Sequence, residues 1–316
     1  MHLLRLLCLR FVWTVWWAVL AILALLTIAG FAARTHYYCE VACHFRVQYL
    51  WLLAALAAAP LAARRWTWAL AAAIFAAANL AVIAPLYFGR PAIGGGRPLR
   101  ALSFNVYADN RNYQATLALI RGARPDFVVL FDVTTAWRQA LLGLADDLPY
   151  SKVITSPGSS GIAIYSRTPF KTIEVRQIGL VPRPLLFGEF DVDGASLTII
   201  AAHTRSPRSA RALADRDHQF DEVAAMLRDV RGPKLLIGDL NTTSWSPAWR
   251  ILVAQTRMRD SRQGHGVQAS WPARLPLLRI PIDHCLVSPE VLVRDRMVER
   301  DCGSDHLPIV IDFSLE

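Results

Sequence analysis

Acidic residues are almost absent from the first third of this 316-residue chain, where Glu40 is the only carboxylate among residues 1–96. A soluble domain of that length carries charges of both signs on its surface, so this part is not an ordinary soluble domain. The whole chain has 54% hydrophobic residues and a mean hydropathy of +0.30, which is too apolar for a wholly soluble protein. The apolar runs contain almost no ionisable groups, which argues against a transport function.

Several signatures of other protein classes are also missing. The chain has no Walker-type phosphate loop, no zinc-spaced cysteine cluster, no dinucleotide fingerprint and no internal repeat. Ser159 and Ser160 stand in Gly-Ser-Ser-Gly, which lacks the Gly-x-Ser-x-Gly spacing of a nucleophile elbow. An α/β-hydrolase interpretation therefore fails.

The net charge of +9 is distributed unevenly. Residues 1–96 hold seven Arg and one Glu, a balance of +6, and residues 97–316 hold 27 basic against 24 acidic residues, a balance of +3. Most of the excess belongs to the apolar part, where arginines at helix ends are expected from topology and lipid headgroups. The charge is thus weak support for nucleic-acid binding. Arg205, Arg208 and Arg211 either contact phosphates or form a solvated helix face.

Three apolar stretches, at about 11–33, 47–63 and 66–88, approach the roughly 20 residues that a helix needs to cross a bilayer. We therefore predict three transmembrane helices, the last two forming a tight hairpin around Arg64 and Arg65. A cleaved signal peptide is the alternative for the first stretch, but two more apolar segments follow and no cleavage site stands out. Tryptophans suited to the membrane interface are Trp13, Trp16, Trp17, Trp51, Trp66 and Trp68.

The arginines that flank these stretches predict the orientation. By a margin of four to three, the positive-inside rule places the N-terminus in the cytoplasm and, after three crossings, everything beyond residue 90 outside. The inner group is Arg5, Arg10, Arg64 and Arg65, and the outer group is Arg34, Arg46 and Arg90.

Cysteine positions leave two alternatives open. Cys39 and Cys43 share the predicted outer loop, and Cys285 and Cys302 flank a predicted strand hairpin. Two disulfides would fit an oxidising compartment, and buried free thiols are the alternative.

A stretch rich in Gly and Pro, residues 91–98, predicts a linker between a transmembrane anchor, residues 1–90, and a second domain, residues 99–316. Because the linker is short, we expect the second domain to work close to the membrane surface. In that domain, amphipathic stretches at 112–121 and 210–230 predict helices. Together with the β-type runs they predict a mixed α/β layer protein, the runs being 99–106, 126–131, 161–165, 185–192, 196–202, 234–237 and 282–287.

Polar residues stand at the ends of these predicted strands, where functional sites are commonly assembled. Each has an ordinary explanation taken singly, because Asn and Asp cap turns and a lone His is usually structural. Their occurrence as an ordered set at successive strand ends indicates a functional site. The set is Asn105, Asp132, His203, Gly238-Asp239-Leu240-Asn241, Asp283-His284 and Ser304-Asp305-His306-Leu307-Pro308.

In this order, the motifs resemble those of the endonuclease/exonuclease/phosphatase family, over essentially all of residues 99–316. The Gly-Asp-x-Asn and Ser-Asp-His-x-Pro elements carry most of the specificity, and the apolar N-terminal helices resemble the membrane-anchored bacterial branch of that family. The resemblance implies a four-layer sandwich of two β-sheets flanked by helices, which hydrolyses phosphodiesters or phosphomonoesters with Mg²⁺ or Mn²⁺. It also implies a bacterial inner membrane, and the orientation predicted from the arginines then places the catalytic domain on the periplasmic face.

The resemblance further implies roles for individual residues. Metal ligands are expected at Asn105, Asp132 and Asp305, all of which carry the hard oxygens that Mg²⁺ prefers. Asp239 is expected to position or deprotonate the attacking water, and His306, oriented by Asp283, is the alternative base. Phosphate contacts are expected from Asn241 and His203.

One position departs from the family pattern, since Asp132 stands where the family usually has Glu. The carboxylate is drawn back by about one C–C bond, so the metal must shift or be bound through water. The alternative is a homologue that has lost efficient metal binding and acts as a membrane-bound binding protein. For an active enzyme, nucleic acid and phospholipid headgroups both remain possible substrates, the bilayer is a partner through the N-terminal helices, and no protein partner is implied.

Overall fold

A computed structural model describes residues 2–89 and 96–316, which form two compact units. Unit 1 comprises Met1–Pro85 together with Trp245–Pro247, and unit 2 comprises Leu86–Ser244 and Ala248–Glu316. Each unit has its own apolar core. Most of the predicted linker, residues 91–98, lies outside the described residues.

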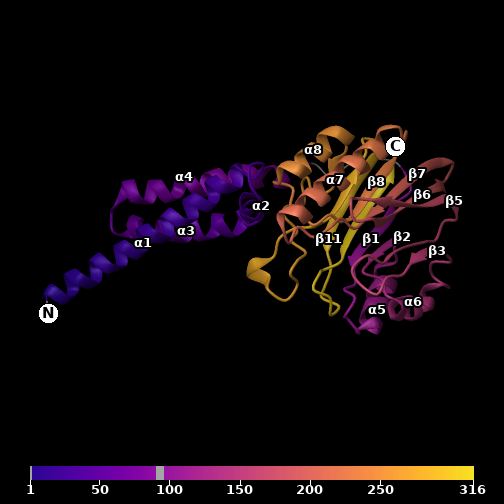
Figure 1. Ribbon diagram of the computed structural model, residues 1–316, viewed down its shortest axis with the longest axis horizontal. Helices are drawn as coiled ribbons and strands as arrows, with labels where there is room; N and C mark the ends of the chain where they lie inside the picture. Colours follow the sequence, from indigo (N-terminus) through magenta and orange to yellow (C-terminus); the bar gives the residue numbers. More distant parts are fainter. Residues whose placement is uncertain (1, 90–95) are drawn as a thin grey trace. The chain divides into compact units, whose positions relative to one another are not determined.

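Unit 1 is helical (Figure 1). It contains α1 (His2–Phe31), α2 (Tyr37–Cys43), α3 (Arg46–Ala62), α4 (Trp66–Ile83) and the 3₁₀ turn η1 (Ala84–Tyr87). The segments Leu6–Phe31 and Trp66–Tyr87 are long and apolar enough to cross a membrane. The pair formed by α2 and α3, bent by 67°, is a third candidate if it counts as one span. The helices α1, α3 and α4 thus cover the three predicted apolar stretches.

Helices α1, α3 and α4 pack through a small apolar core that includes Trp16 and Ala72. Small residues such as alanine let helix backbones approach closely, which is common between membrane helices. Beside this core, the guanidinium of Arg65 lies over the rings of Trp13 and Trp68, 4.5 and 4.3 Å from their centroids. Tryptophan and arginine together are typical of a membrane interface.

Glu40, the only carboxylate among the first 96 residues, is buried within unit 1. The Ser246 hydroxyl donates to Glu40 Oε1 at 2.6 Å, and the His44 Nε2 atom lies 3.9 Å from the same oxygen. The Cys43 thiol lies 3.7 Å from Oε2. Because a buried carboxylate is costly unless polar groups surround it, this cluster accounts for the one acidic residue that the apolar segment retains.

Unit 2 is built on two six-stranded β-sheets. The first has the strand order β11-β12-β1-β2-β4-β3, and the second has the order β5-β6-β7-β8-β10-β9. The pairs β1 with β2 and β7 with β8 are parallel. The strands are β1 (Leu99–Asn105), β2 (Phe127–Phe131), β3 (Tyr150–Ile154), β4 (Ile162–Ser166), β5 (Phe170–Ile178), β6 (Arg183–Val192), β7 (Ala195–Ala202), β8 (Lys234–Asp239), β9 (Arg259–Asp260), β10 (Asp283–Val287), β11 (Val291–Val298) and β12 (Ile309–Leu315).

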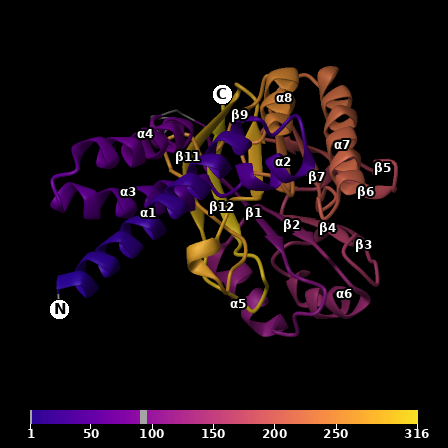
Figure 2. The same cartoon turned by 60° about the vertical axis from the view of Figure 1, so that its left-hand side comes forward.

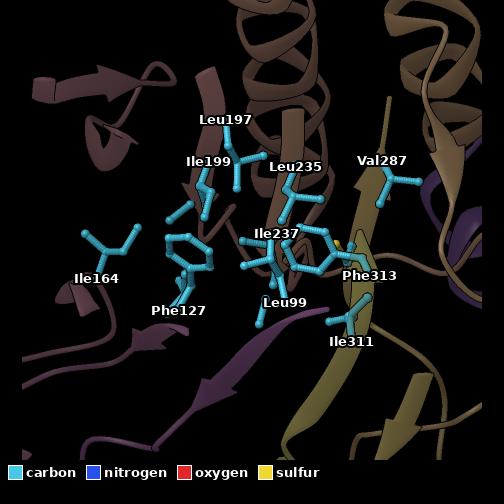
Figure 3. Close-up of a cluster of buried hydrophobic side chains, with 14 of the residues drawn as sticks. Leu99, Phe127, Ile164, Leu197, Ile199, Leu235, Ile237, Val287, Ile311 and Phe313 are labelled. Atoms are coloured by element: carbon cyan, nitrogen blue, oxygen red, sulfur yellow. The ribbon is translucent and has the colours of Figure 1, made fainter. Parts of the chain in front are cut away.

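The inner faces of the two sheets meet in the main core (Figure 3). Phe127 and Phe313 come from the first sheet and Leu235 from the second, and burial of each such side chain stabilises the fold by about 2 kcal/mol. Helices α5 (Tyr113–Ala123) and α6 (Thr135–Leu141) cover the outer face of the first sheet. Helices α7 (Ala210–Arg228) and α8 (Pro247–Thr256) cover that of the second. The four layers confirm the predicted fold class.

The predicted strand hairpin between Cys285 and Cys302 is wrong. Strand β10, which contains Cys285, pairs with β8 and β9 in the second sheet, whereas β11 pairs with β12 in the first. Consecutive strands separate here because each has a buried face on a different sheet. Cys285 lies in the core between the sheets and Cys302 in the core under α5 and α6.

All five cysteines of the chain are free thiols, so the disulfide alternative is wrong. The alternative of buried free thiols holds for Cys43, Cys285 and Cys302, whereas Cys39 is only partly buried. Cys285 and Cys302 lie on opposite faces of the first sheet and cannot meet. Cys39 and Cys43 lie along the single helix α2. Cys43 is buried beside the Glu40 carboxylate instead of turning toward Cys39.

Candidate active site

The strand order of unit 2 brings the predicted site residues to one end of the sandwich. Asn105 ends β1, and Asp132 follows its parallel neighbour β2, so the two side chains leave the sheet at the same edge. In the second sheet, Asp239 ends β8 and stands opposite Asp283, the first residue of the antiparallel strand β10. Chain direction and register together therefore assemble residues that are far apart in the sequence.

The glycine of the Gly-Asp-x-Asn motif, Gly238, is required by the close approach of neighbouring strands. A Cβ atom at this position would lie 1.9 Å from the Ala202 carbonyl oxygen and 2.8 Å from the ring of Phe131. Only glycine lets β8 approach β7 and the first sheet this closely. The motif thus holds Asp239 between the two sheets.

Asp239 is the centre of the site and is buried. The Asn241 backbone N–H donates to its Oδ1 at 3.1 Å, and the Asn105 amide donates to its Oδ2 at 3.1 Å. Two imidazole nitrogens also face Oδ2, Nε2 of His203 at 3.4 Å and Nε2 of His306 at 3.6 Å. Burial raises the pKa of Asp239, against the opposing influence of the two histidines. The carboxylate is therefore prepared to accept a proton.

His306 and Asp283 form a buried dyad. Nδ1 of His306 lies 2.9 Å from Oδ2 of Asp283, and the Asp283 backbone N–H donates to the Ser270 hydroxyl at 3.3 Å. Burial alone would lower the pKa of His306, but the carboxylates of Asp283 and Asp239 raise it to about 10. Burial would likewise raise the pKa of Asp283, but the charge and hydrogen bond of His306 hold it below its usual range. The pair is an imidazolium and a carboxylate.

Asp132 stands directly after β2 with a left-handed backbone, φ 60°, a conformation that Asp tolerates better than most residues. Its Oδ1 atom lies 3.2 Å from Nδ1 of His203. The direction of this contact does not meet hydrogen-bond geometry, so the buried Oδ1 makes no hydrogen bond with the described residues. His203 thus lies between the carboxylates of Asp132 and Asp239.

One carboxylate oxygen of Asp305 accepts a hydrogen bond, and the other does not. Trp271 Nε1–H donates to its Oδ2 at 3.1 Å, while its buried Oδ1 makes no hydrogen bond with the described residues. The orphaned oxygens of Asp132 and Asp305 are hard, anionic ligands of the kind that Mg²⁺ and Mn²⁺ take. Asn105 is less available, since its Oδ1 accepts the backbone N–H of Tyr107 at 3.0 Å. Asp132 and Asp305 therefore each offer the kind of oxygen that a divalent metal ion takes, with Asn105 in a supporting position.

One group of site residues in unit 2 has ligand atoms close enough for a metal. One ligand atom each of Asp239, Asp283 and His306 lies within 4.8 Å of the others. The hydrogen bond between His306 and Asp283 already joins two of these groups. Their arrangement suits proton transfer better than it suits metal binding.

Asn241 is shaped by the loop after β8. It has φ 47°, and its side-chain amide donates to the Thr204 carbonyl at 2.9 Å. One N–H of the amide is thereby used within the protein, which leaves the other for a ligand. The next carbonyl, that of Thr242, lies 2.7 Å from Nε2 of His284. His284 therefore helps to hold this loop in place through the Thr242 carbonyl.

The sequence did not indicate Arg183, the first residue of β6. Its guanidinium donates to the Ser159 carbonyl at 2.5 Å, which places it beside the Gly-Ser-Ser-Gly loop. Burial lowers the pKa of Arg183, while the charges of Asp132 and Asp239 act in the opposite direction, so the cation is within electrostatic reach of the site. An arginine at a strand start has no motif around it, and nothing in the sequence distinguished it. In the predicted patch of Arg205, Arg208 and Arg211, the Arg205 guanidinium is already paired with the Asp215 carboxylate at 3.0 Å.

Comparison with known proteins gives consistent matches for unit 2. A sequence model of the endonuclease/exonuclease/phosphatase family matches residues 102–306. Among curated proteins, none gives a significant match.

Three solved structures illustrate the likeness in fold. An endonuclease/exonuclease/phosphatase from Beutenbergia cavernae is 23% identical over 69% of this chain and 72% of that one, with a TM-score of 0.56. TDP2 from D. rerio, in complex with a single strand DNA product, is 19% identical over 69% and 99%, with a TM-score of 0.57. Sphingomyelinase C from Streptomyces griseocarneus is 19% identical over 68% and 99%, with a TM-score of 0.55. At these identities the likeness shows a shared fold.

Proposed function

The chain belongs to the endonuclease/exonuclease/phosphatase family, and we propose that it is a membrane-anchored phosphoesterase that hydrolyses a phosphodiester with a divalent metal ion. One observation carries the proposal: Asp239 lies among Asn105, His203 and His306 at distances of 3.1 to 3.6 Å, and His306 is bonded to Asp283. This is a buried proton acceptor beside a buried proton donor. Hydrolysis of an ester by water needs both.

Asp132 and Asp305, supported by Asn105, are the residues that would hold Mg²⁺ or Mn²⁺. The ion supplies positive charge that neutralises the phosphate and the developing leaving group. Their orphaned carboxylate oxygens support this assignment.

The proton machinery follows from the chain's own side chains. Asp239 takes the proton of the attacking water, because burial raises the pKa of its carboxyl group. Among the residues that the structure describes, each carboxylate oxygen accepts only one hydrogen bond, so it can still accept a proton. His306 carries a proton on Nε2 and provides it to the departing oxygen, and Asp283 keeps the ring oriented. Asn241, His203 and Arg183 provide N–H groups for the phosphate oxygens.

The membrane anchor is proposed to comprise residues 1–90, followed by a linker at 91–98 and the catalytic domain at 99–316. Helix α3 has 17 residues. It is therefore about 26 Å long, close to the thickness of a bilayer core. Counting the bent pair as one span gives three crossings, which put the catalytic domain on the side opposite the N-terminus. With the arginine distribution, that side is the periplasmic face of a bacterial inner membrane.

The experiment uses the full chain in detergent micelles with bis-p-nitrophenyl phosphate. We expect turnover with Mg²⁺ or Mn²⁺ and none with excess EDTA. Asp239→Asn and His306→Ala should each lower kcat by about 100-fold or more. The matched control is His265→Ala, because His265 is a histidine of unit 2 that contacts Asp295 and none of the site residues.

Two outcomes would contradict the proposal in different ways. Activity that survives both site substitutions would refute the assigned mechanism. A folded wild-type chain without turnover on any phosphate ester, with either metal, would favour the membrane-bound binding protein.

A further inference from the structure

A short loop of unit 2 exposes an unusual amount of apolar surface. In this apolar loop, residues 273–279, the side chains of Leu275, Leu277 and Leu278 are 54%, 88% and 49% exposed. Single exposed leucines are common on protein surfaces, but three within four positions form an exposed apolar patch of the kind that marks an interaction surface.

The leucines are exposed because the loop is held in shape. Pro276–Leu278 form the 3₁₀ turn η3, and the Leu278 N–H donates to the Leu275 carbonyl at 2.9 Å. At the base, Arg279 donates to the Ala273 carbonyl through Nε at 3.1 Å and through Nη2, which closes the loop. Figures 1 and 2 show the turn, in gold, standing away from the two sheets. A braced loop of this kind keeps its leucines on the outside.

The residues at the base of the apolar loop contact residues of the candidate active site. Trp271 Nε1–H donates to Oδ2 of Asp305 at 3.1 Å, and the Ala273 N–H donates to the Asp305 carbonyl at 2.7 Å. On the same segment, the Ser270 hydroxyl accepts the backbone N–H of Asp283 at 3.3 Å. The segment that leads into the leucines is therefore bonded directly to Asp305 and Asp283.

The charges around the leucines point to one kind of partner. Arg274 and Arg279 flank them, and no acidic residue occurs between Trp271 and Ile282. Aliphatic side chains with arginines at their base match the interface of a bilayer, where acyl chains lie beneath anionic headgroups. A nucleic acid would match the arginines but not the leucines.

The chain itself brings a bilayer near. The candidate span Trp66–Tyr87 ends in residues that already belong to unit 2, which begins at Leu86. If that segment crosses the membrane, unit 2 begins at the membrane surface, so a lipid interface is always within its reach.

We propose that the apolar loop inserts into the headgroup region of the membrane and that the substrate is the phosphoester of a lipid headgroup. The substrate half of this inference rests on the proposed phosphoesterase activity, and the insertion half does not. Insertion positions Asp305 and the catalytic residues over the headgroups, so the enzyme hydrolyses phosphoesters where they project from the bilayer.

Insertion is tested with the full chain in nanodiscs of phosphatidylcholine and phosphatidylglycerol. A spin label is attached to Leu277→Cys in a background in which Cys8 and Cys39, the thiols that are not buried, are replaced by Ser. The control carries the label at Leu142→Cys, since Leu142 is a 59% exposed leucine in the 3₁₀ turn Leu142–Leu144. We expect the label at 277 to be accessible to oxygen and shielded from a water-soluble nickel complex, and the label at 142 to show the reverse. Equal, aqueous accessibility at both positions would overturn insertion.

The substrate is tested with Leu277→Asp and the matched control Leu142→Asp. For the first, the ratio of activity on phosphatidylglycerol vesicles to activity on bis-p-nitrophenyl phosphate should fall about 10-fold or more, mainly through KM, because one leucine no longer leaves water. For the second, the ratio should not change. Wild-type hydrolysis of single-stranded DNA but not of lipid would overturn the substrate class, as would an equal loss on both esters in Leu277→Asp. If the wild type hydrolyses neither ester, the proposed function fails and the substrate half fails with it, while the spin label still decides insertion.

Discussion

Oδ2 of Asp239 lies 3.6 Å from Nε2 of His306, and the other ring nitrogen of the same histidine lies 2.9 Å from Oδ2 of Asp283. One imidazole therefore bridges two buried carboxylates, which stand opposite each other on neighbouring strands. A protein tolerates such a concentration of buried charge only where the charges compensate one another. This bridge is the physical basis for the following prediction.

Asp283→Asn should lower kcat for bis-p-nitrophenyl phosphate by about 100-fold, with little change in KM. The amide keeps the shape of the carboxylate but removes the charge that holds the imidazolium. Steady-state kinetics check this result. Ser270→Ala, which removes a hydroxyl next to Asp283 but leaves both members of the dyad in place, serves as the control and should cost much less. Equal effects of the two substitutions would mean that the dyad is structural.

Asp132→Asn should raise the Mg²⁺ or Mn²⁺ concentration needed for half-maximal activity by about 10-fold or more. Asn removes the anionic ligand but tolerates the left-handed backbone at φ 60°, so Tm should hardly change. Metal titration of activity and thermal unfolding check the two expectations. Unchanged metal dependence would show that Asp132 is not a ligand. Asp132→Glu, which restores the residue usual in the family, should instead lower the required metal concentration.

Arg183→Gln should raise KM for phosphate esters by about 10-fold, because a cation within electrostatic reach of Asp132 and Asp239 is lost from the proposed phosphate site. Arg176→Gln is the matched control, since Arg176 lies on β5 and is paired with Glu174 at 2.8 Å. A change confined to kcat would place Arg183 in the chemical step and not in substrate binding.

Stability should fall as the solution is acidified, because His284 is buried as a neutral ring. Nδ1 faces Arg262 Nη2 at 3.1 Å and Nε2 faces the Thr242 carbonyl at 2.7 Å, so Nδ1 must accept and Nε2 must donate. Burial and then the charge of Arg262 lower the pKa of His284 from 6.5 to about 3.

Between about pH 3 and pH 6.5, His284 is therefore protonated in the unfolded chain and neutral in the folded chain. The contribution of His284 to the free energy of unfolding is complete above pH 6.5 and is lost as the pH falls toward 3. The loss is about 1.4 kcal/mol per pH unit. Thermal unfolding in detergent at several pH values measures it. His284→Gln keeps one acceptor and one donor without titrating, so its Tm should fall less steeply. Parallel slopes for the two proteins would contradict the assignment.

Much of the fold followed from the sequence because strand ends and motif residues coincide. Asn105, Asp132 and Asp239 each follow a buried apolar run, and the structure places all three at the same end of the sandwich. What the sequence could not specify is which sheet a strand joins. Strands β10 and β11 are close neighbours in the chain and resemble a hairpin, yet the core between the sheets separates them.

The candidate site was predictable only where a residue belongs to a motif. Arg183 has no such context, because it is an arginine at a strand start. His284 stands beside Asp283 in the sequence, but its partners, Arg262 and Thr242, come from other segments. The geometry around Asp132 was equally hidden, because its left-handed backbone is set by the turn after β2. These features depend on tertiary packing, which local pattern does not encode.

The position of β12 has a consequence for folding. This strand lies between β11 and β1, and just before it the Ser304 hydroxyl donates to the Asn105 carbonyl at 2.7 Å across 199 residues of chain. Without β12, strand β1 would have an unpaired edge, and the segment just before β12, which carries Asp305 and His306, would lose its anchor to the sheet. The first sheet must therefore be closed by β12 before these two residues can be held beside the other site residues.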